Sequence, residues 1–200
     1  DEKFDYQIQK QTWSPENYGK KYYGTVPLFF ALKNSLNAST AKIGLEVGLN
    51  SIIETAESMG VESHLKPFPA MTLGAFELYP IEVLRSYMAL SQMGRKSEIS
   101  YVLRVQDASN NILYEFEPHM TEYEDPASVA ELVGMMKQTL LSGTAKAIAA
   151  SGFYYPAAGK TGTTSDYKDS WFGGFTPRKT TVVWVGYDQN ERTGLTGASA

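Results

Sequence analysis

A lysine and three threonines stand close together near the end of this 200-residue sequence, in the run Gly159-Lys160-Thr161-Gly162-Thr163-Thr164. The surrounding residues favour a β-strand over residues 157–165, so Thr161 and Thr163 share one face while Lys160 and Gly162 share the other. Because Gly162 has no side chain, the backbone of an extended substrate could pair with this strand beside the two hydroxyls. A phosphate loop is disfavoured, because it needs a further glycine upstream, where the chain has tyrosine, and a helix directly after the lysine.

A second short run, Ser35-Leu36-Asn37, lies where one helical segment ends and another begins. Ser and Asn are ordinary capping residues, and a lone Lys-Thr-Gly is usually a strand with a solvated lysine, so neither run indicates catalysis by itself. Their joint occurrence changes the interpretation, because both accompany a Ser-x-x-Lys nucleophile in serine acyl-enzymes. That chemistry is attack by a serine oxygen on a carbonyl, with a base nearby and donors aimed at the oxyanion.

The composition argues against several other classes of function. The chain has no cysteine, and its two histidines, His64 and His119, lack metal-ligand spacing and are expected at the surface, so we predict neither metal nor cofactor. A net charge of −4 without a long basic run predicts no nucleic-acid partner. No signal-peptide pattern opens the sequence, and its apolar stretches are far shorter than the roughly 18–20 residues that cross a bilayer, so this segment is not expected to contact a membrane.

Helices are expected to position the Ser35 run. Residues 1–24 are expected to form an irregular lead-in, followed by a helix over residues 27–34 and another over residues 38–47. A third helix is expected from an N-cap at Asn50 to Gly60. Pro80 opens a helix over residues 80–93, whose core-facing stripe is predicted to contain Ile81, Leu84 and Met88.

Strands are expected to position the Lys160 run. Residues 101–106 and 112–116 alternate around a polar turn and predict a surface hairpin. Asp125-Pro126 starts a helix that ends at Gly143, a short helix follows over residues 145–150, and the apolar face of the longer one holds Val129, Leu132, Val133, Met136 and Leu140. Three strands at residues 157–165, 170–176 and 180–188 then predict an antiparallel meander. The fold class is α+β (mixed α/β), a single domain with helices packed against an antiparallel sheet.

Longer phrases of the sequence resemble a known family. The chain is similar to the transpeptidase domain of class A penicillin-binding proteins in Asn17-Tyr18, residues 31–40, Leu73-Gly74-Ala75, Gly143-Thr144-Ala145, and residues 158–165, 169–177 and 183–188. These phrases follow in order through nearly the whole chain, and the wording AGKTGTTSDYKDSWFGGFTP is far more specific than any tripeptide. The resemblance implies a fold like that of penicillin-binding proteins and serine β-lactamases.

The same resemblance implies roles for individual residues. Ser35 would relay protons to the leaving group, Asn37 would hold a side-chain carbonyl of the substrate, and Lys160 would supply positive charge and orient Ser35. Thr161 and Thr163 would bind the carboxylate of a peptidoglycan stem peptide or β-lactam, and the Thr163 N–H would form half of the oxyanion hole. Gly162 and Thr164 complete the implied substrate-binding strand.

The chain departs from the family pattern at the nucleophile. The family places its Ser-x-x-Lys well before the Ser-x-Asn, and no such motif occurs there, so the nucleophilic serine is expected upstream of Asp1. Residues 165–168 do spell Ser-x-x-Lys, but they follow the Lys160 strand and are predicted to form a turn, where no helix N-terminus could activate the serine. The segment is thus expected to be a partial transpeptidase domain that lacks the nucleophile region and the final helix.

The resemblance also implies a larger setting. The parent protein would be a membrane-anchored DD-transpeptidase acting outside the cytoplasm, with a glycosyltransferase domain upstream and the rest of the transpeptidase domain as partner of this segment. The segment alone would be inactive. A non-catalytic binding or scaffold domain of the same fold is the alternative, since every residue present fits both. A class B transpeptidase or a serine β-lactamase is disfavoured by the wording around Lys160 and residues 169–177.

Overall fold

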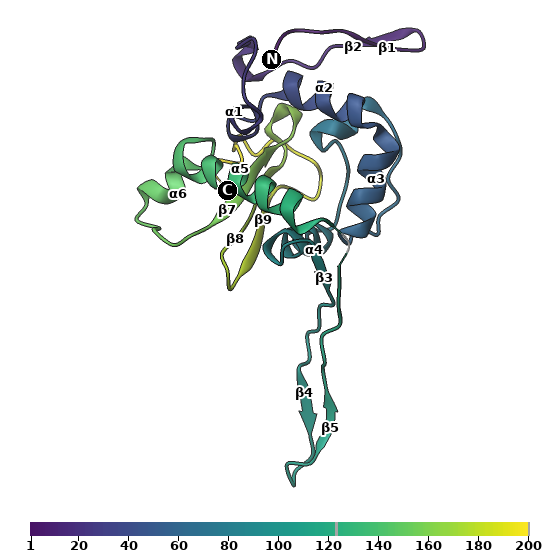
Figure 1. Ribbon diagram of the computed structural model, residues 1–200, viewed down its shortest axis with the longest axis vertical. Coiled ribbons are helices and arrows are strands. Elements are labelled where there is room, and N and C mark those ends of the chain that lie inside the picture. The colour runs from purple at the N-terminus through teal and green to yellow at the C-terminus, as the bar shows by residue number, and fades with distance from the viewer. Residues whose placement is uncertain (123, 200) are drawn as a thin grey trace.

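The computed structural model describes residues 1–122 and 124–199. Figure 1 shows a body of helices gathered around the sheet of β7, β8 and β9, with a small hairpin at one end and a long two-stranded arm at the other. The predicted α+β class is confirmed. Among the described residues, no helix has both the length and the apolar character that a bilayer crossing requires.

The first three helices lie close to their predicted positions. They are α1 (Leu28–Lys33), α2 (Asn37–Val47) and α3 (Leu49–Ser58). The predicted N-cap at Asn50 is wrong, because α3 starts at Leu49 directly after Gly48, whose φ of 98° lets the chain turn sharply between two helices.

The lead-in is more regular than predicted. It contains the hairpin of β1 (Tyr6–Ile8) and β2 (Gln11–Trp13), and the 3-10 turn η1 (Tyr18–Lys20). Its strands are only three residues long, too short for an alternating pattern to identify them.

Helix α4 (Pro80–Ser91) follows the 3-10 turn η2 (Pro69–Leu73). Its predicted stripe is wrong in register: Ile81, Leu84 and Met88 are only half-buried, whereas Leu90 joins the core and Tyr87 packs against it. The buried face of α4 is shifted because the Tyr87 ring packs directly against Gly173 of β8. A side chain at position 173 would block this contact, since its Cβ would lie only 2.5 Å from the ring. The missing side chain at Gly173 therefore makes room for Tyr87.

The arm is a pair of successive two-stranded ladders. The predicted hairpin is confirmed as β4 (Arg104–Gln106) paired with β5 (Ile112–Glu115). A second pair, β3 (Arg95–Ser97) with β6 (Met120–Glu122), joins the arm to the body and was not expected, because both strands are short and mostly polar. Figure 1 shows the arm projecting away from the helices.

Helix α5 (Pro126–Ser142) carries much of the core. Asp125 caps it by accepting from Ser128 N at 2.8 Å, and the predicted apolar face is confirmed. Val129, Met136 and Leu140 are buried, and Leu132 and Val133 pack against the core cluster that also contains Ala158 and Phe175. Burial of each of the side chains of Val129, Met136 and Leu140 stabilises the fold by about 1.5–3 kcal/mol. The short helix α6 (Lys146–Ala150) follows.

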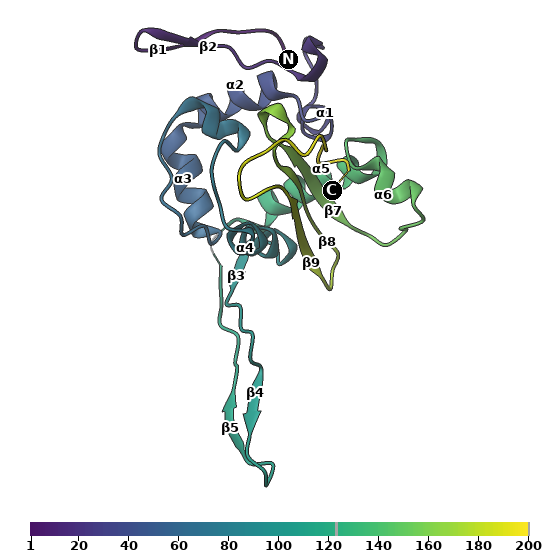
Figure 2. The same cartoon turned by 180° about the vertical axis from the view of Figure 1, so that it is seen from behind.

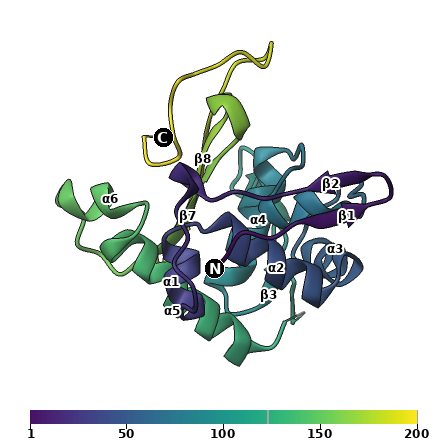
Figure 3. The same cartoon turned by 90° about the horizontal axis from the view of Figure 1, so that it is seen from above.

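The predicted meander is confirmed as β7 (Ala158–Thr163), β8 (Ser170–Phe175) and β9 (Thr180–Val185), all antiparallel, with the 3-10 turn η3 (Ser165–Tyr167) between the first two. Within the described ranges β7 has a strand neighbour on one side only, so its other edge is open. Figure 2 and Figure 3 show the C-terminal segment returning past the strands of the sheet. It is held there by a hydrogen bond from Gly197 N to Thr163 Oγ1 at 2.9 Å.

Candidate functional site

Ser35 and Lys160 meet in the structure although 125 positions separate them. Lys160 Nζ donates to Ser35 Oγ at 2.8 Å and to the backbone oxygen of Thr161 at 2.9 Å. The first residue belongs to the turn between α1 and α2, and the second to the edge strand β7. A hydroxyl is thus held against an ammonium group, as proton relay through a serine requires.

The turn that carries Ser35 is tightly specified. Ser35 has a φ of 54°, in a left-handed region that costs free energy for a residue with a side chain and that is found often at functional sites. Ser35 N bonds to Leu32 O at 3.1 Å, and Leu36 N bonds to Ala31 O at 3.0 Å. The side chain of Leu36, the next residue, is buried and anchors the turn in the interior. The surrounding structure therefore imposes the direction in which Ser35 points.

Asn17 anchors the start of α2 from outside that helix. It is 4% exposed, and its Oδ1 accepts from Ala38 N at 3.0 Å, in place of the side-chain cap that α2 lacks. Its Nδ2 donates to Lys21 O at 2.9 Å. Nothing in its type or spacing separates Asn17 from an ordinary loop asparagine, so its only signal in the sequence is its place in a family phrase.

Burial changes the chemistry of Lys160. Desolvation lowers the pKa of the Lys160 ammonium from 10.5 to about 8, because a buried charge loses contact with water. The group is therefore charged at neutral pH but poised to lose its proton in the mildly alkaline range. Such a lysine suits a site where positive charge and proton transfer are both needed.

The threonines of β7 have different environments. Thr161 is buried, and its Oγ1 lies 2.6 Å from Thr144 Oγ1. Thr163 is exposed and accepts from Gly197 N, as described above. Thr164 closes the turn after β7, since its Oγ1 accepts from Asp169 N at 2.8 Å and donates to Asp169 Oδ2 at 3.1 Å.

The remaining predicted residues flank this cluster. Asn37 is the first residue of α2, and its Nδ2 donates to Glu16 O at 2.9 Å, in the lead-in segment. Gly162 lies where the C-terminal segment crosses β7, and a Cβ on Gly197 would collide with the Gly162 oxygen. Glycine at position 197 permits this close backbone approach.

The chain spells Ser-x-x-Lys in three places, and the structure brings none of them to the Ser35–Lys160 pair. At residues 39–42, Ser39 is buried and donates to Asp1 Oδ1 at 2.9 Å, while Lys42 pairs with Glu2 at 3.1 Å. At residues 63–66, Ser63 Oγ donates to Glu82 Oε2 at 2.9 Å. Ser165 is exposed in η3, in the turn that the sequence predicts. The two engaged hydroxyls face carboxylates and not a lysine.

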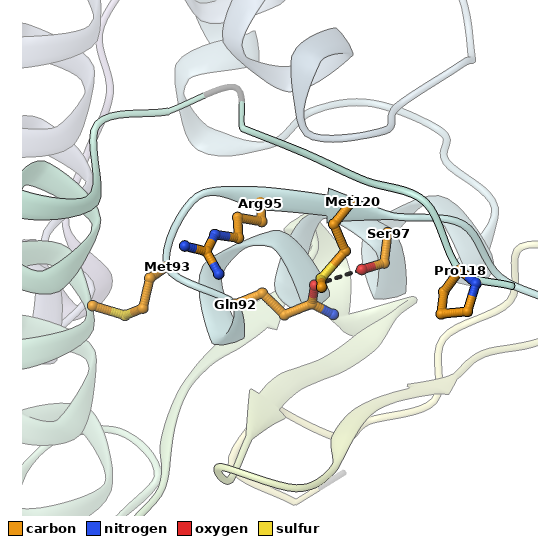
Figure 4. A pocket seen from close by; sticks show the side chains of 6 residues that line it. All are labelled: Gln92, Met93, Arg95, Ser97, Pro118 and Met120. Carbon is orange, nitrogen blue, oxygen red and sulfur yellow. Dashed lines mark hydrogen bonds between the residues drawn. The ribbon is translucent and has the colours of Figure 1, made fainter.

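Two pockets lie away from the cluster. One of about 570 Å³ is at the base of the arm, where Figure 4 shows Gln92, Met93, Arg95, Ser97, Pro118 and Met120 around it, with Ser97 Oγ donating to Gln92 Oε1 at 2.5 Å. The other, of about 330 Å³, is lined mainly by apolar and aromatic residues of α5, α6 and residues 153–157. Neither of these two pockets is lined by Ser35 or Lys160.

Comparison with known proteins places the chain in a family. The family model of the penicillin-binding protein transpeptidase domain matches residues 1–200. Penicillin-binding protein 1B of Vibrio cholerae is 39% identical over 188 residues, which cover 94% of this chain and 24% of that protein. Penicillin-binding protein 1B of Escherichia coli is 37% identical over 193 residues, with 94% and 23% covered. The chain thus spans about a quarter of the length of these relatives.

Solved structures share the fold. The crystal structure of penicillin-binding protein 1A from Haemophilus influenzae matches with a TM-score of 0.92 at 23% identity, over 100% of this chain and 36% of that one. PonA1 from Mycobacterium tuberculosis, solved in complex with penicillin V, matches with a TM-score of 0.81 at 21% identity, over 97% and 57%. The full-length family match, the identity to penicillin-binding proteins 1B and the common fold together show that the chain belongs to the transpeptidase domain family of class A penicillin-binding proteins.

Proposed function

We propose that this chain is part of a peptidoglycan DD-transpeptidase, in which it supplies the Ser-x-Asn and Lys-Thr-Gly walls of the active site. The observation that carries the proposal is the 2.8 Å hydrogen bond from Lys160 Nζ to Ser35 Oγ, made between residues 125 positions apart. A structural role alone gives no reason to join a strained serine to a desolvated lysine at an open strand edge. Family membership supplies the reaction in which such a pair is used.

The reaction is acyl transfer through a covalent intermediate. A serine oxygen attacks the carbonyl of the penultimate D-Ala of a stem peptide, the C–O bond forms, and the C–N bond to the terminal D-Ala breaks. Ser35 relays the proton that the attacking serine loses to the departing amine, which leaves as free D-Ala. An amine of a neighbouring strand then displaces the serine and completes the cross-link. A β-lactam acylates the same serine through its ring carbonyl.

The other residues bind the substrate in this proposal. Lys160 supplies the positive field, Thr161 and Thr163 donate to the terminal carboxylate, and Asn37 holds a side-chain carbonyl of the stem peptide. The extended substrate lies along the open edge of β7 beside Gly162 and Thr164, where an additional strand can pair. The attacking serine belongs to a Ser-x-x-Lys outside the 200 residues.

The whole protein is larger and acts outside the cytoplasm in this proposal. Its relatives are about four times as long as the chain, which leaves room for the nucleophile region, a glycosyltransferase domain and a membrane anchor. The segment alone would be inactive, because acylation needs the attacking oxygen as well as the supporting donors.

Two assays on the full-length protein test the function. We expect a fluorescent penicillin to label it covalently at one serine, and a stem-peptide substrate to release D-Ala and form cross-linked product. Replacement of the labelled serine by alanine should abolish both. A protein that binds penicillin reversibly, forms no adduct and releases no D-Ala would be the non-catalytic scaffold instead.

A further inference from the structure

The turn between α5 and α6, residues 143–145, touches both walls of the candidate site. Thr144 N donates to Lys33 O at 3.1 Å, at the last residue of α1 and two positions before Ser35. Thr144 Oγ1 lies 2.6 Å from Thr161 Oγ1, on the strand wall. One residue therefore connects the Ser35 turn to a threonine that is proposed to bind the substrate carboxylate.

The backbone of this turn is held with little freedom. Thr139 O accepts from both Gly143 N at 3.2 Å and Ala145 N at 3.1 Å. A Cβ at Gly143 would collide with Lys33 O, so only glycine allows the close approach to α1. Lys33 Nζ adds a bond to Ser142 Oγ at 3.1 Å. Thr144 thus projects its hydroxyl from a fixed position.

In the pair of Thr144 and Thr161 either hydroxyl can be the donor, and a bound ligand determines which of them donates. A hydroxyl donates one hydrogen, and a carboxylate only accepts. When a carboxylate binds to Thr161, the Thr161 hydrogen must point to it, and Thr144 must then be the donor within the pair. Hydrogen bonds in such a chain strengthen one another in a site of low polarity, and Thr161 is only 9% exposed.

We propose that Thr144 is a positioning residue for carboxylate recognition: its hydroxyl donates to Thr161, so that Thr161 presents its own hydrogen to the substrate, and its backbone holds this pair in register with the Ser35 turn. The inference rests on the proposed function. It assigns a role to a threonine that does not itself touch the substrate.

The test compares two probes on the full-length protein and its Thr144→Val variant. One probe is a fluorescent penicillin with its free carboxylate, and the other is the methyl ester of the same compound. Valine keeps the shape of threonine but removes the donor, so acylation by the free acid should slow by up to about tenfold, the upper end of what one hydrogen bond between neutral groups contributes. Acylation by the ester should change by less than about twofold, because the ester carries no negative charge for Thr161 to recognise.

Two further variants separate positioning from folding. Thr144→Ser keeps the hydroxyl and should restore the preference for the free acid. Thr139→Val removes a fully buried hydroxyl in the same region that has no hydrogen-bond partner among the described residues, and it should leave both rates unchanged. Equal slowing of both probes in Thr144→Val, or no slowing of either, would overturn the role of Thr144. If the unmodified protein forms no adduct with the free acid, the proposed function itself fails and this inference fails with it.

Discussion

The Nζ atom of Lys160 donates hydrogen bonds to two oxygens, Ser35 Oγ and the Thr161 carbonyl oxygen, and is largely shielded from water. This shielding lowers the pKa of Lys160 to about 8 and gives the proposed site a pH limit. Above that pH the lysine becomes neutral, and the attraction for a substrate carboxylate is lost. At the scale of the residue, the ionisation of Lys160 should therefore appear directly in the kinetics.

The second-order rate of acylation by penicillin should fall by about tenfold per pH unit above pH 8, because this rate reports ionisation in the free enzyme. In a Lys160→Arg variant, the guanidinium stays charged through this range, so the alkaline fall should disappear even though the rate is lower throughout. Stopped-flow labelling between pH 6 and about 10 measures both profiles. An identical alkaline limb in the two proteins would assign it to another group.

At the scale of the elements, α4 is joined to the loop after α3 through one buried carboxylate. Glu82 is 2% exposed, and it accepts from Glu62 N at 2.8 Å, Ser63 N at 2.6 Å, Ser63 Oγ at 2.9 Å and Tyr79 N at 2.8 Å. Burial by itself would raise the pKa of Glu82, but the hydrogen bonds from Tyr79, Glu62 and Ser63 outweigh it and lower the pKa below the ordinary 4.5. The folded structure therefore stabilises the charged form of Glu82.

Glu82→Gln should destabilise the domain by about 2–3 kcal/mol. The substitution replaces one carboxylate oxygen by an NH₂ group, which would face the N–H and O–H donors that now bond to Glu82. Calorimetry of the full-length protein would detect this as a fall of about 5–10 °C in the melting temperature of this domain. Since folding lowers the pKa of Glu82, its stabilisation is present above pH 4.5 and is lost as the pH falls through the folded value, so the variant and the parent should converge in acid. Glu62→Gln is the control, because its side chain is 71% exposed and should matter little. Equal melting temperatures for Glu82→Gln and the parent would contradict this account.

Long periodic elements could be predicted from the sequence, whereas short or tertiary features could not. The apolar face of α5 follows from a repeat that runs along the whole helix, and the six-residue strands β7, β8 and β9 follow from strand-like runs separated by short turns. The strands β1, β2, β3 and β6 have three residues each and belong to no longer alternating run, whereas β4, equally short, follows from the alternation of residues 101–106 before a polar turn. The stripe of α4 was misplaced because the space left at Gly173 selects Tyr87, which no helical period reveals.

The same contrast applies to the site. Ser35 and Lys160 could be paired from motifs that a family shares, and the structure brings them together. Asn17 and Thr144 could not be given roles, because their contacts run to Ala38, Lys33 and Thr161, in segments distant along the chain.

At the scale of the whole molecule, the arm and the site lie apart. Figure 1 shows β4 and β5 extending from the far end of the body, away from α1 and the turn that carries Ser35. Replacing residues 101–116 with a short Gly-Ser linker should therefore leave the rate of penicillin acylation within about twofold of the parent, the spread expected for distant independent sites. Labelling kinetics of the shortened full-length protein measure this. A loss of tenfold or more with an unchanged melting temperature would show that the arm communicates with the site.

Ser35 and Lys160 should act as one unit in acylation, and a double-mutant cycle tests this most directly. The acylation rate by penicillin would be measured for the full-length protein, Ser35→Ala, Lys160→Ala and the double variant. Each single change should slow acylation by about 10²–10³-fold, as the loss of one preorganised polar group does. The double variant should be no more than a few-fold slower than either single one, because groups that act together are lost together. Single variants that label at the parent rate, or a double variant whose loss equals the product of the two single losses, would contradict the claim.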